Sequence, residues 1–278
     1  MAKKNYNIVV AFFTIPGGLV ASLLRKPFIL MLRGSDVPFH DPRFHRIDMV
    51  LQHIVPLIWK CASRVVANSE GLKEEAISIY PVDIDVIPNG VDIKKFYPSE
   101  DRDIKQILSC GRLSPVKNFD LLIDAFSIVK NEINDAKLRI IGDGPERRNL
   151  ESKIAELGLK DCVDLSGAAN HDEMPHIYRT SGVYVLTSHN EGMNNTLLEA
   201  IASGLPIVST HVGGVDELIG DNGIIIEERD PDILADAIVR IITSHNYWQM
   251  CRRSREIAEG FTWERVTARL IELIETCI

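Results

Sequence analysis

Residues 106–132 read QILSCGRLSPVKNFDLLIDAFSIVKNE and give the clearest indication of the fold. They begin with a short apolar run, Gln106–Cys110, which is typical of a buried strand. A polar loop that contains glycine follows at Gly111–Asn118, and Phe119–Glu132 then has one apolar face at helical spacing. That face consists of Leu121, Leu122, Ala125, Phe126 and Val129. A strand, a glycine-bearing loop and an amphipathic helix in this order predict a βα unit of a parallel sheet.

The same succession recurs on both sides of this unit. In the second part of the chain, strands are expected at Gln106–Cys110, Leu138–Ile141, Val163–Ser166, Val183–Leu186, Pro206–Ser209 and Gly223–Ile226. Asp230 and Pro231 predict the beginning of one helix, and the last helix should begin near Thr262. In the first part, strands are expected at Ile8–Phe13, Phe28–Arg33, Arg64–Ala67 and Asp85–Ile87, with helices at Val50–Ala62 and Glu70–Ile79. The sequence therefore predicts an α/β protein with parallel sheets, in which the first part is the smaller.

Length and composition exclude several classes of protein. The chain has 278 residues, of which 45% are hydrophobic and 25% charged, as in average soluble globular proteins. The net charge of −8 disfavours nucleic-acid binding. The 5 cysteines are scattered without a C-x-x-C pair, which fits a reducing cytosol better than a disulfide framework or a zinc site. Pro16, Gly17 and Gly18 interrupt the most apolar stretch, Ile8–Leu24, and favour a strand, a turn and a short helix over a membrane span or a signal peptide.

Two basic residues lie in the loop after the Gln106–Cys110 strand. Parallel α/β sheets bind ligands at the carboxyl ends of their strands, so Arg112 and Lys117 are candidates for binding a diphosphate. Gly111 lets the backbone turn sharply, and Asn118 is expected to cap the helix that follows. Two solvated surface charges are the alternative interpretation.

The loop after Val183–Leu186 is a second candidate for binding an anion. Asn194 or Asn195 should cap the next helix, whose first amides attract negative charge. Glu191 precedes this helix and Glu199 lies about one turn inside it. Their carboxylates can accept hydrogen bonds from the vicinal hydroxyls of a sugar or a ribose. For Glu199 an ordinary position on the helix surface is the alternative.

Two further loops contain paired glycines. Gly213 and Gly214 either leave room for a ligand close to the backbone or form a plain turn into a helix that Asp216 caps. The segment Gly142–Pro145 is only half of a dinucleotide fingerprint, because Arg147 stands where the third glycine should be. NAD binding is therefore not expected.

Taken in order, these motifs resemble the retaining family 4 glycosyltransferases of the GT-B fold. The matching motifs are GRLSPVKN at 111–118, IIGDGPE at 140–146, EGMNNTLLE at 191–199, ASGLPIV at 202–208 and GGVDE at 213–217. VANS at 66–69 with Gly71, and IPNGVD at 87–92, match the region between the two domains of the family. Since the motifs occur in the family's order from Val66 to Glu217, the resemblance is specific.

The resemblance implies that the second domain binds a nucleotide-diphosphate sugar. Arg112 and Lys117 would hold the diphosphate and act in catalysis together with Glu191, which would contact the donor sugar. Glu199 would accept hydrogen bonds from the ribose hydroxyls. The other donor-binding residues would be Gly111, Gly192, Met193, Asn194, Asn195, Gly213, Gly214 and, against the base, Gly167. No metal ion or other cofactor is expected, because cationic side chains and a helix dipole neutralise the leaving diphosphate.

The resemblance also implies a division of the chain. Residues 1–98 would form a partial, acceptor-side Rossmann-like domain, 99–261 the donor-binding Rossmann-like domain, and 262–278 a helix that crosses back toward the first domain. The first domain lacks the family's first strand and the glycine-rich loop after it. A truncated gene, a misassigned start and a partner chain that supplies this part are the alternatives.

Three residues are expected on the acceptor or sugar side of the site. Arg33 stands where many relatives have a histidine, so no histidine role carries over to it, and Asp36 lies in the same loop. His189 is two residues from Glu191 and is expected to neighbour the site.

The expected function is retaining transfer of a hexosyl or related group from a nucleotide-diphosphate sugar to a saccharide or lipid-linked acceptor, in polysaccharide or glycolipid biosynthesis. The alternative is a non-catalytic, nucleotide-sugar-binding fragment or subunit of a split glycosyltransferase. No nucleic-acid partner is expected, and a second copy or a partner chain would complete the first sheet. The expected location is the cytoplasm. The basic residues Arg25, Lys26, Arg43 and Arg46 indicate peripheral contact with the inner face of the membrane, with a solvated surface as the alternative.

Overall fold

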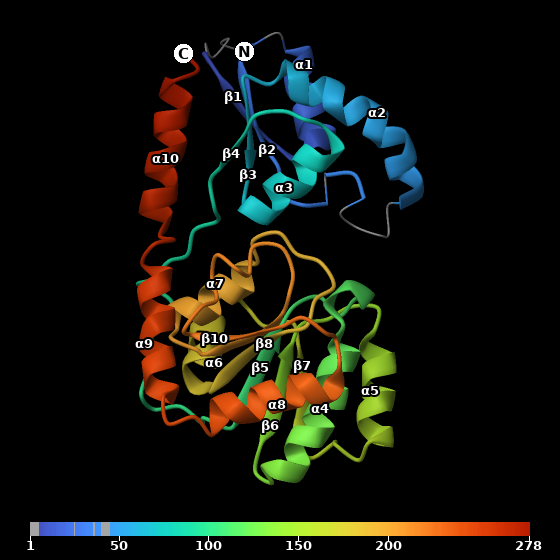
Figure 1. Ribbon diagram of the computed structural model, residues 1–278, viewed down its shortest axis with the longest axis vertical. Helices are drawn as coiled ribbons and strands as arrows, with labels where there is room; N and C mark the ends of the chain where they lie inside the picture. Colours follow the sequence, from blue (N-terminus) through green and yellow to red (C-terminus); the bar gives the residue numbers. More distant parts are fainter. Residues whose placement is uncertain (1–5, 25, 36, 40–44) are drawn as a thin grey trace. The chain divides into compact units, whose positions relative to one another are not determined.

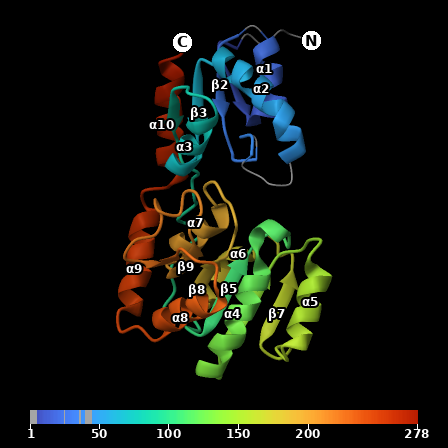
Figure 2. The same cartoon turned by 45° about the vertical axis from the view of Figure 1, so that its right-hand side comes forward.

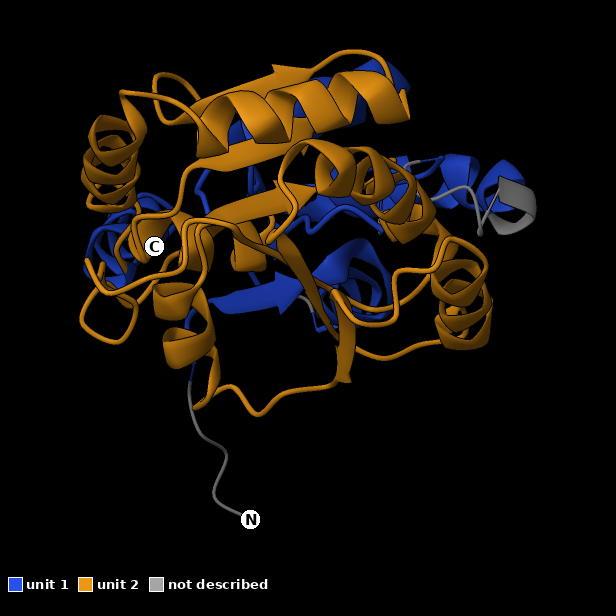
Figure 3. Cartoon of the chain, turned by 90° about the horizontal axis from the view of Figure 1, so that it is seen from below, with its two compact units in different colours: residues 1–89, 190–193, 263–278 blue, residues 90–189, 194–262 orange. Residues whose placement is uncertain are grey.

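The computed structural model describes residues 6–24, 26–35, 37–39 and 45–278, with the side chains of residues 45–47 left out. The chain divides into two compact units (Figure 3). Unit 1 consists of Met1–Asn89, Asn190–Met193 and Trp263–Ile278, and unit 2 of Gly90–His189 and Asn194–Thr262. The domain limits expected from the sequence, at residues 98 and 261, stay a prediction.

Unit 1 is built on a parallel sheet with the strand order β1-β2-β3-β4 (Figure 1). The strands are β1 Val9–Phe12, β2 Phe28–Met31, β3 Arg64–Ala67 and β4 Ile84–Val86. A π-type turn at Phe13–Gly18 and the helices α1 Leu19–Leu23, α2 His45–Cys61 and α3 Glu70–Ile79 connect them. Because each connection moves one strand in the same direction, right-handed crossovers place these helices on one face of the sheet.

The other face of this sheet is covered by the last helix, α10, at Trp263–Glu275. Its apolar side chains, among them Val266 and Leu270, pack against Ile29 and Met31 of β2 and Val66 of β3. The core on the first face includes the buried Trp59 of α2, whose indole Nε1 donates a hydrogen bond to Thr14 Oγ1 at 2.9 Å. Both faces of the sheet are therefore covered, as buried parallel strands require.

Unit 2 is a six-stranded parallel sheet with the order β10-β9-β8-β5-β6-β7. The strands are β5 Gln106–Cys110, β6 Lys137–Ile141, β7 Val163–Gly167, β8 Val183–Leu186, β9 Ile207–Thr210 and β10 Gly223–Ile226. The helices are α4 Phe119–Glu132, α5 Arg147–Glu156, α6 Met174–Thr180, α7 Asn195–Ala202, α8 Pro231–Ile242 and α9 Tyr247–Ala258. In chain order this arrangement is the 3-2-1-4-5-6 order of Rossmann folds.

Two groups of helices pack in unit 2. Helix α4 packs against α5 on one side and α8 on the other (Figures 1 and 2). Helix α7 packs against α6 and α9. The strand order reverses between β5 and β8, so the connections that leave these two neighbours run in opposite directions. In open α/β sheets, ligands bind at the carboxyl ends of the strands at such a reversal.

Most strand predictions are confirmed, with ends that shift by one or two residues. One alternative and one local expectation are wrong. The residues after Asp216 form turns and no helix, because the segment reaches β10 after only a few residues. Asn118 occupies the N-cap position of α4, but it has a left-handed φ of 50° and its side chain makes no capping hydrogen bond. The predicted caps at Asp230 and at Asn194 are confirmed, since each side chain accepts two backbone amides.

Candidate functional site

The loop after β5 places a lysine over the end of its own strand. It contains a 3-10 turn at Pro115–Lys117. A Cβ atom built on Gly111 would lie 3.3 Å from Cε of Lys117, so the lysine stem passes directly over this glycine. The side chain of Arg112 is exposed in the same loop. Both predicted cations therefore lie at the carboxyl end of β5.

The loop after β8 is hydrogen-bonded to the loop after β5. The amide of His189 donates to the carbonyl of Val116 at 2.8 Å, and the hydroxyl of Thr187 donates to the carbonyl of Lys117 at 2.9 Å. The carbonyl of His189 accepts a hydrogen bond from Arg229. Burial lowers the pKa of the His189 imidazole, and the positive charge of Arg229 lowers it further. The two loops at the reversal of strand order are thus held together by hydrogen bonds to the backbone carbonyls of Val116 and Lys117.

Helix α7 begins beside the end of β5. Asn194 Oδ1 accepts the amides of Thr196 and Leu197 at 2.9 and 3.2 Å. The hydroxyl of Thr196 lies 2.6 Å from that of Tyr184 on β8 and 3.4 Å from the carbonyl of Cys110 on β5. Because the amides of Thr196 and Leu197 are engaged, an anion at this helix would rely on amides that precede Thr196. The predicted Asn194 cap thus occupies two of the first amides of the helix.

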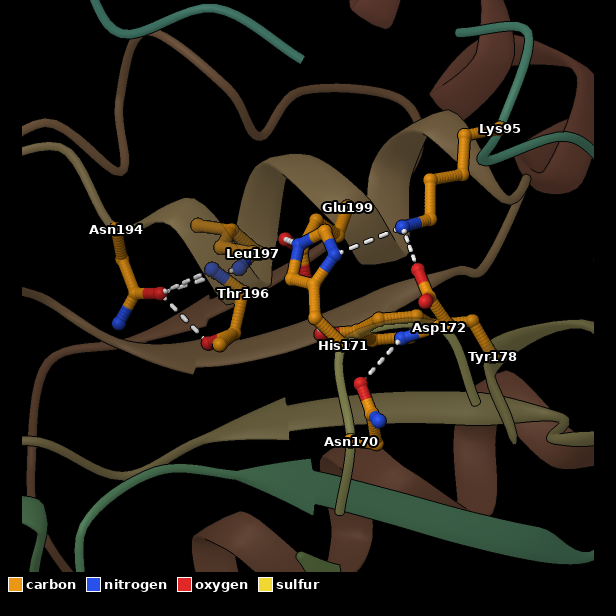
Figure 4. A network of polar contacts seen from close by, with 9 residues as sticks. All are labelled: Lys95, Asn170, His171, Asp172, Tyr178, Asn194, Thr196, Leu197 and Glu199. Atoms are coloured by element: carbon orange, nitrogen blue, oxygen red, sulfur yellow. Dashed lines mark hydrogen bonds and ion pairs between the residues drawn. The ribbon is translucent and has the colours of Figure 1, made fainter. Parts of the chain in front are cut away.

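Glu199 is not a surface glutamate. Its side chain lies one turn inside α7 and is only 14% exposed. The hydroxyl of Tyr178 donates to Oε2 at 3.0 Å, and Nε2 of His171 lies 3.2 Å from Oε1 (Figure 4). Burial raises the pKa of Glu199, whereas Tyr178 and His171 act in the opposite direction. The carboxylate is therefore held in place by two side chains that α6 and the loop before it supply.

Three glycines bring the ends of β5, β6 and β7 close together. The amide of Gly111 donates to the carbonyl of Ile141 at 2.9 Å, and the amide of Gly142 donates to the carbonyl of Gly167 at 2.8 Å. Gly167 has a positive φ of 80°, and the guanidinium of Arg147 lies beside it and donates to the carbonyl of Leu165 at 2.9 Å. The end of β7, where a base was expected to bind, thus has an arginine next to it.

The glycine pair Gly213–Gly214 lies after β9, the neighbour of β8. At this end of β9 the hydroxyl of Thr210 donates to the carbonyl of Ser188 at 2.8 Å. His211 contacts the carboxylates of Asp216 and Glu227, and the contact with Asp216 raises its pKa. Gly213 and Gly214 therefore belong to the same edge of the sheet as the other predicted loops.

The remaining predicted residues fall in unit 1. Arg33 donates a hydrogen bond to Oδ1 of Asn89 and lies over the ring of Phe12, and Nδ2 of Asn89 donates to the carbonyl of Met193 at 2.9 Å. A Cβ atom on Gly192 would lie 3.0 Å from Oδ1 of Asn68. Unit 1 therefore brings Arg33 together with the segment that also contains Glu191. Asp36 lies outside the described residues.

The two units thus gather two sets of predicted residues. Unit 2 collects the larger set at the carboxyl edge of its sheet: Gly111, Arg112, Lys117, Gly167, His189, Asn194, Asn195, Glu199, Gly213 and Gly214. Unit 1 contains Arg33, Glu191, Gly192 and Met193.

Sequence reasoning missed Lys95, His171 and Tyr178, which surround Glu199. Lys95 Nζ lies 2.9 Å from His171 Nδ1 and 2.7 Å from Asp172 Oδ1. The signal that could have found His171 is its place in the loop after β7, since every such loop at this edge is a ligand candidate. No local sequence pattern indicates Tyr178 or Lys95 as site residues. Lys95 precedes β5 and Tyr178 lies in α6, so neither is in a loop that directly follows a strand.

One cavity lies away from these loops. It has a volume of about 810 Å³ and is lined by Pro98, Ser99, Glu100, Arg102, Trp248, Cys251, Arg252, Arg255 and Glu256. Arg102 donates to the carbonyls of Ser203 and Gly204, and Arg255 donates to that of Ala202. These two arginines thus bind the carboxyl end of α7, where carbonyls lack helical partners. None of the predicted site residues lines the cavity.

Among the described residues, no group of three or more histidine, cysteine, aspartate or glutamate side chains could hold a metal ion. Nor is any helix in the described ranges long and apolar enough to cross a bilayer. Of the predicted basic cluster, Lys26 is exposed, Arg25 and Arg43 lie outside the described residues, and the side chain of Arg46 is likewise not described.

The fold and the loops at its sheet edge define an α/β protein with two parallel sheets, and family models identify its relatives. The model for glycosyl transferases group 1 matches residues 92–260, and the model for glycosyltransferase family 4 matches residues 1–95. The chain therefore belongs to the glycosyl transferases group 1 family.

Individual relatives and a solved structure agree with this assignment. The chain is 27% identical over 282 residues to an uncharacterized glycosyltransferase of Methanocaldococcus jannaschii, and it covers 73% of that protein. It is 32% identical over 231 residues to a D-inositol 3-phosphate glycosyltransferase of Paenarthrobacter aurescens, with 76% of this chain and 57% of the relative covered. The chain thus spans between about half and three quarters of the length of these curated relatives.

The crystal structure of HepE from Anabaena in complex with UDP-glucose resembles the whole chain. The TM-score is 0.84 at 22% identity, and the match covers 98% of this chain and 79% of HepE. At this level of identity the likeness shows the fold. The expected GT-B fold with parallel sheets is confirmed.

Proposed function

We propose that the chain is a retaining glycosyltransferase that transfers a sugar, of the hexosyl or a related type, from a nucleotide-diphosphate donor to a saccharide or lipid-linked acceptor. The observation that carries the proposal is the hydrogen-bonded pair of loops after β5 and β8, where Val116 and Lys117 accept from His189 and Thr187. This pair combines two cations and a helix N-terminus at the reversal of strand order, a combination suited to a diphosphate.

The proposed donor contacts follow from charge and donor count. Lys117 supplies a point charge and Arg112 a fork of donors to the diphosphate oxygens. The amides that precede Thr196 add to them at the positive end of α7. Glu199, whose oxygens only accept when it is ionised, takes the ribose hydroxyls. Gly167 and the neighbouring Arg147 lie where the base would be placed. The solved relative HepE was crystallised with UDP-glucose, which supports a nucleotide sugar as the donor here.

The proposed chemistry is loss of the nucleoside diphosphate with attack by the acceptor on the same face of the sugar. The bond between the anomeric carbon and the diphosphate oxygen breaks as the acceptor oxygen bonds to that carbon. The acceptor proton leaves with the diphosphate oxygens. Lys117 and Arg112 stabilise the charge that develops on the leaving group, so no metal ion is needed in this proposal. Glu191 is proposed to contact the donor sugar, with Arg33 and His189 toward the acceptor.

Donor hydrolysis and transfer test this function directly. The chain is incubated with a panel of nucleotide sugars, with and without saccharide and lipid-linked acceptors, and nucleoside diphosphate release is measured. We expect turnover with at least one donor, and NMR of the product should show that the anomeric configuration is retained. Glu191→Ala should lower kcat by about 10²-fold, the scale of a lost transition-state contact. The exposed Glu132→Ala is the matched control, and an equal loss in both variants would contradict the assignment of Glu191.

A specific surface favours association of the chain with a second copy of itself. Strand β1 is at an edge of its sheet, and apolar side chains of unit 1 are exposed: Phe12 of β1 at 48%, Leu23 of α1 at 74% and Leu57 of α2 at 60%. An open strand edge and an apolar surface both promote association. We propose that this surface pairs with a second copy of the chain.

The oligomeric state in solution tests this surface. We expect a dimer by light scattering coupled to size-exclusion chromatography, and a monomer for the variant Leu23→Glu with Leu57→Glu. The control is Leu157→Glu, which changes a residue in unit 2 that is 42% exposed. A monomeric wild-type chain, or a double variant that stays dimeric, would refute the pairing. Turnover by a monomeric double variant would show that the pairing is not needed for activity.

Membrane contact and location stay proposals. The chain is proposed to lie in the cytoplasm and to touch the inner face of the membrane, where lipid-linked acceptors are available. Lys26 is the described member of the basic cluster and is exposed. Pelleting with anionic vesicles, compared with neutral ones, measures this contact.

A further inference from the structure

The carboxylate of Glu199 is enclosed by donors on both oxygens. Tyr178 is fully buried and donates to Oε2 at 3.0 Å, while His171 Nε2 lies 3.2 Å from Oε1. An ionised carboxylate has about four acceptor positions, so roughly two remain. The remaining positions match the two hydroxyls of a vicinal diol.

Lys95 determines which nitrogen of His171 carries the proton. Lys95 Nζ lies 2.9 Å from His171 Nδ1 and 2.7 Å from Asp172 Oδ1 (Figure 4). An ammonium group can only donate, so Nδ1 must accept. The imidazole proton of neutral His171 is therefore on Nε2, where it points at Glu199. The series of contacts then has a donor and an acceptor at each step. Lys95 donates to both Asp172 and His171, and His171 donates to Glu199.

Aromatic packing fixes two of these side chains, His171 and Tyr178. The ring of Phe96, next to Lys95 in sequence, meets the rings of His171 and Tyr178 edge-on, with centroids 5.7 and 5.8 Å apart. Phe96 is itself buried. One aromatic residue thus holds both donors of Glu199 at their positions, although His171 is otherwise exposed.

We propose that Lys95, His171 and Tyr178 are positioning residues that keep Glu199 ionised and aimed at the ribose diol of the nucleotide, and that Lys95 acts through His171. This inference rests on the proposed function, because it assumes that Glu199 meets a ribose. It adds three residues that do not touch the reacting atoms to the donor site of unit 2. It also predicts that recognition of the ribose hydroxyls depends on pH.

The direction of the pH dependence follows from the groups around Glu199. Tyr178 comes from α6, His171 and Lys95 come from loops, and the Cys110 thiol at the end of β5 stays neutral because burial raises its pKa. Burial raises the pKa of Glu199, and its partners lower it. A protonated Glu199 would offer a donor in place of an acceptor. Ribose recognition is therefore present above the pKa of Glu199 and is lost as the pH falls through it.

The test compares two ligands whose diphosphates are identical. Calorimetry measures the affinity for whichever of UDP, GDP and ADP binds most tightly, and for its 2′,3′-dideoxy analogue, from about pH 4 to about pH 8, a range that includes the ordinary pKa values of glutamate and histidine side chains. The ratio of the two affinities isolates the ribose hydroxyls, because protonation of the diphosphate affects both ligands alike. Wild-type protein should show a ratio that falls in acid.

The variant His171→Leu removes the hydrogen-bond donor to Glu199, and Lys95→Met removes the cation beside His171. Each should reduce the ratio at neutral pH about 3- to 10-fold, the effect of one hydrogen bond, and move its acid midpoint to higher pH. Affinity for the dideoxy ligand should stay the same. The control is His176→Leu, since His176 is another exposed histidine of the same segment.

The outcomes separate this inference from the function on which it rests. If no nucleoside diphosphate binds, or if Glu199→Gln keeps the wild-type ratio, the proposed donor site is wrong and the inference falls with it. If Glu199→Gln abolishes the ratio but His171→Leu and Lys95→Met leave its midpoint in place, only the inference is wrong. A merely structural role would weaken both ligands equally and would also overturn it.

Discussion

Lys117→Ala is expected to lower transfer by about 10²- to 10³-fold in kcat, the range measured when one preorganised donor to a developing oxyanion is removed. The lysine stem passes over Gly111, with Cε 3.3 Å from a Cβ built there, so its ammonium is carried at the end of β5 and is not a freely moving surface charge. Its own carbonyl accepts from Thr187, which ties the residue to the loop after β8. The charge is thus held where a leaving diphosphate would need it.

Steady-state kinetics with the preferred donor measure this effect. The control is Lys160→Ala, which removes an exposed lysine of the same unit and should leave kcat within a factor of about two, as for ordinary surface changes. A fall in kcat with an unchanged KM would mean that Lys117 acts mainly in the transition state. If Lys117→Ala and Lys160→Ala turned over alike, the loop after β5 would not be the diphosphate site.

The sequence predicts the sheets well because buried parallel strands are short apolar runs with little else in them. QILSC at β5 and VYVL at β8 are examples, and both strands end where expected. Helices α5 and α9 carry a weaker signal. Leu150 and Ile154 are the buried residues of α5, and the buried face of α9 includes the small residues Ser254 and Ala258. A pattern search cannot find a face made of so few large apolar residues.

The candidate site is predictable only where its residues are close in sequence. Lys117 follows its strand by a few residues, and Glu199 follows the Asn194 cap by one turn, so spacing is informative for both. Lys95 and Tyr178 reach Glu199 from segments that the fold alone brings together. Spacing also predicts the Asn194 cap correctly, but the same reasoning fails at Asn118, which has a left-handed φ of 50° and makes no capping hydrogen bond.

Gly142→Ala is expected to destabilise unit 2 by about 3 kcal/mol or more, since overpacking and backbone strain each cost about 1–3 kcal/mol. A Cβ at this position would lie 1.8 Å from the carbonyl oxygen of Gly111, a distance that no rotation of a side chain can relieve. Gly142 also has a φ of 146°, which residues with a Cβ rarely adopt. In Gly142→Ala the loop after β5 must therefore shift. We expect nucleoside diphosphate binding to weaken together with the stability of unit 2.

Two control variants separate the clash from the strain. Gly158 has a positive φ of 70°, and a Cβ built on it would have no atom within 4 Å. Gly158→Ala should therefore lose about 1 kcal/mol of stability through backbone strain alone. Gly220→Ala has open space and no positive φ, so its stability should stay within about 0.5 kcal/mol of wild type. Urea unfolding measures the free energy of unfolding of all three variants, provided that its dependence on urea concentration has the same slope in each. If Gly142→Ala cost no more than Gly158→Ala, the close approach of β6 to the Gly111 carbonyl would be wrong. The glycine would then serve the site only through its φ.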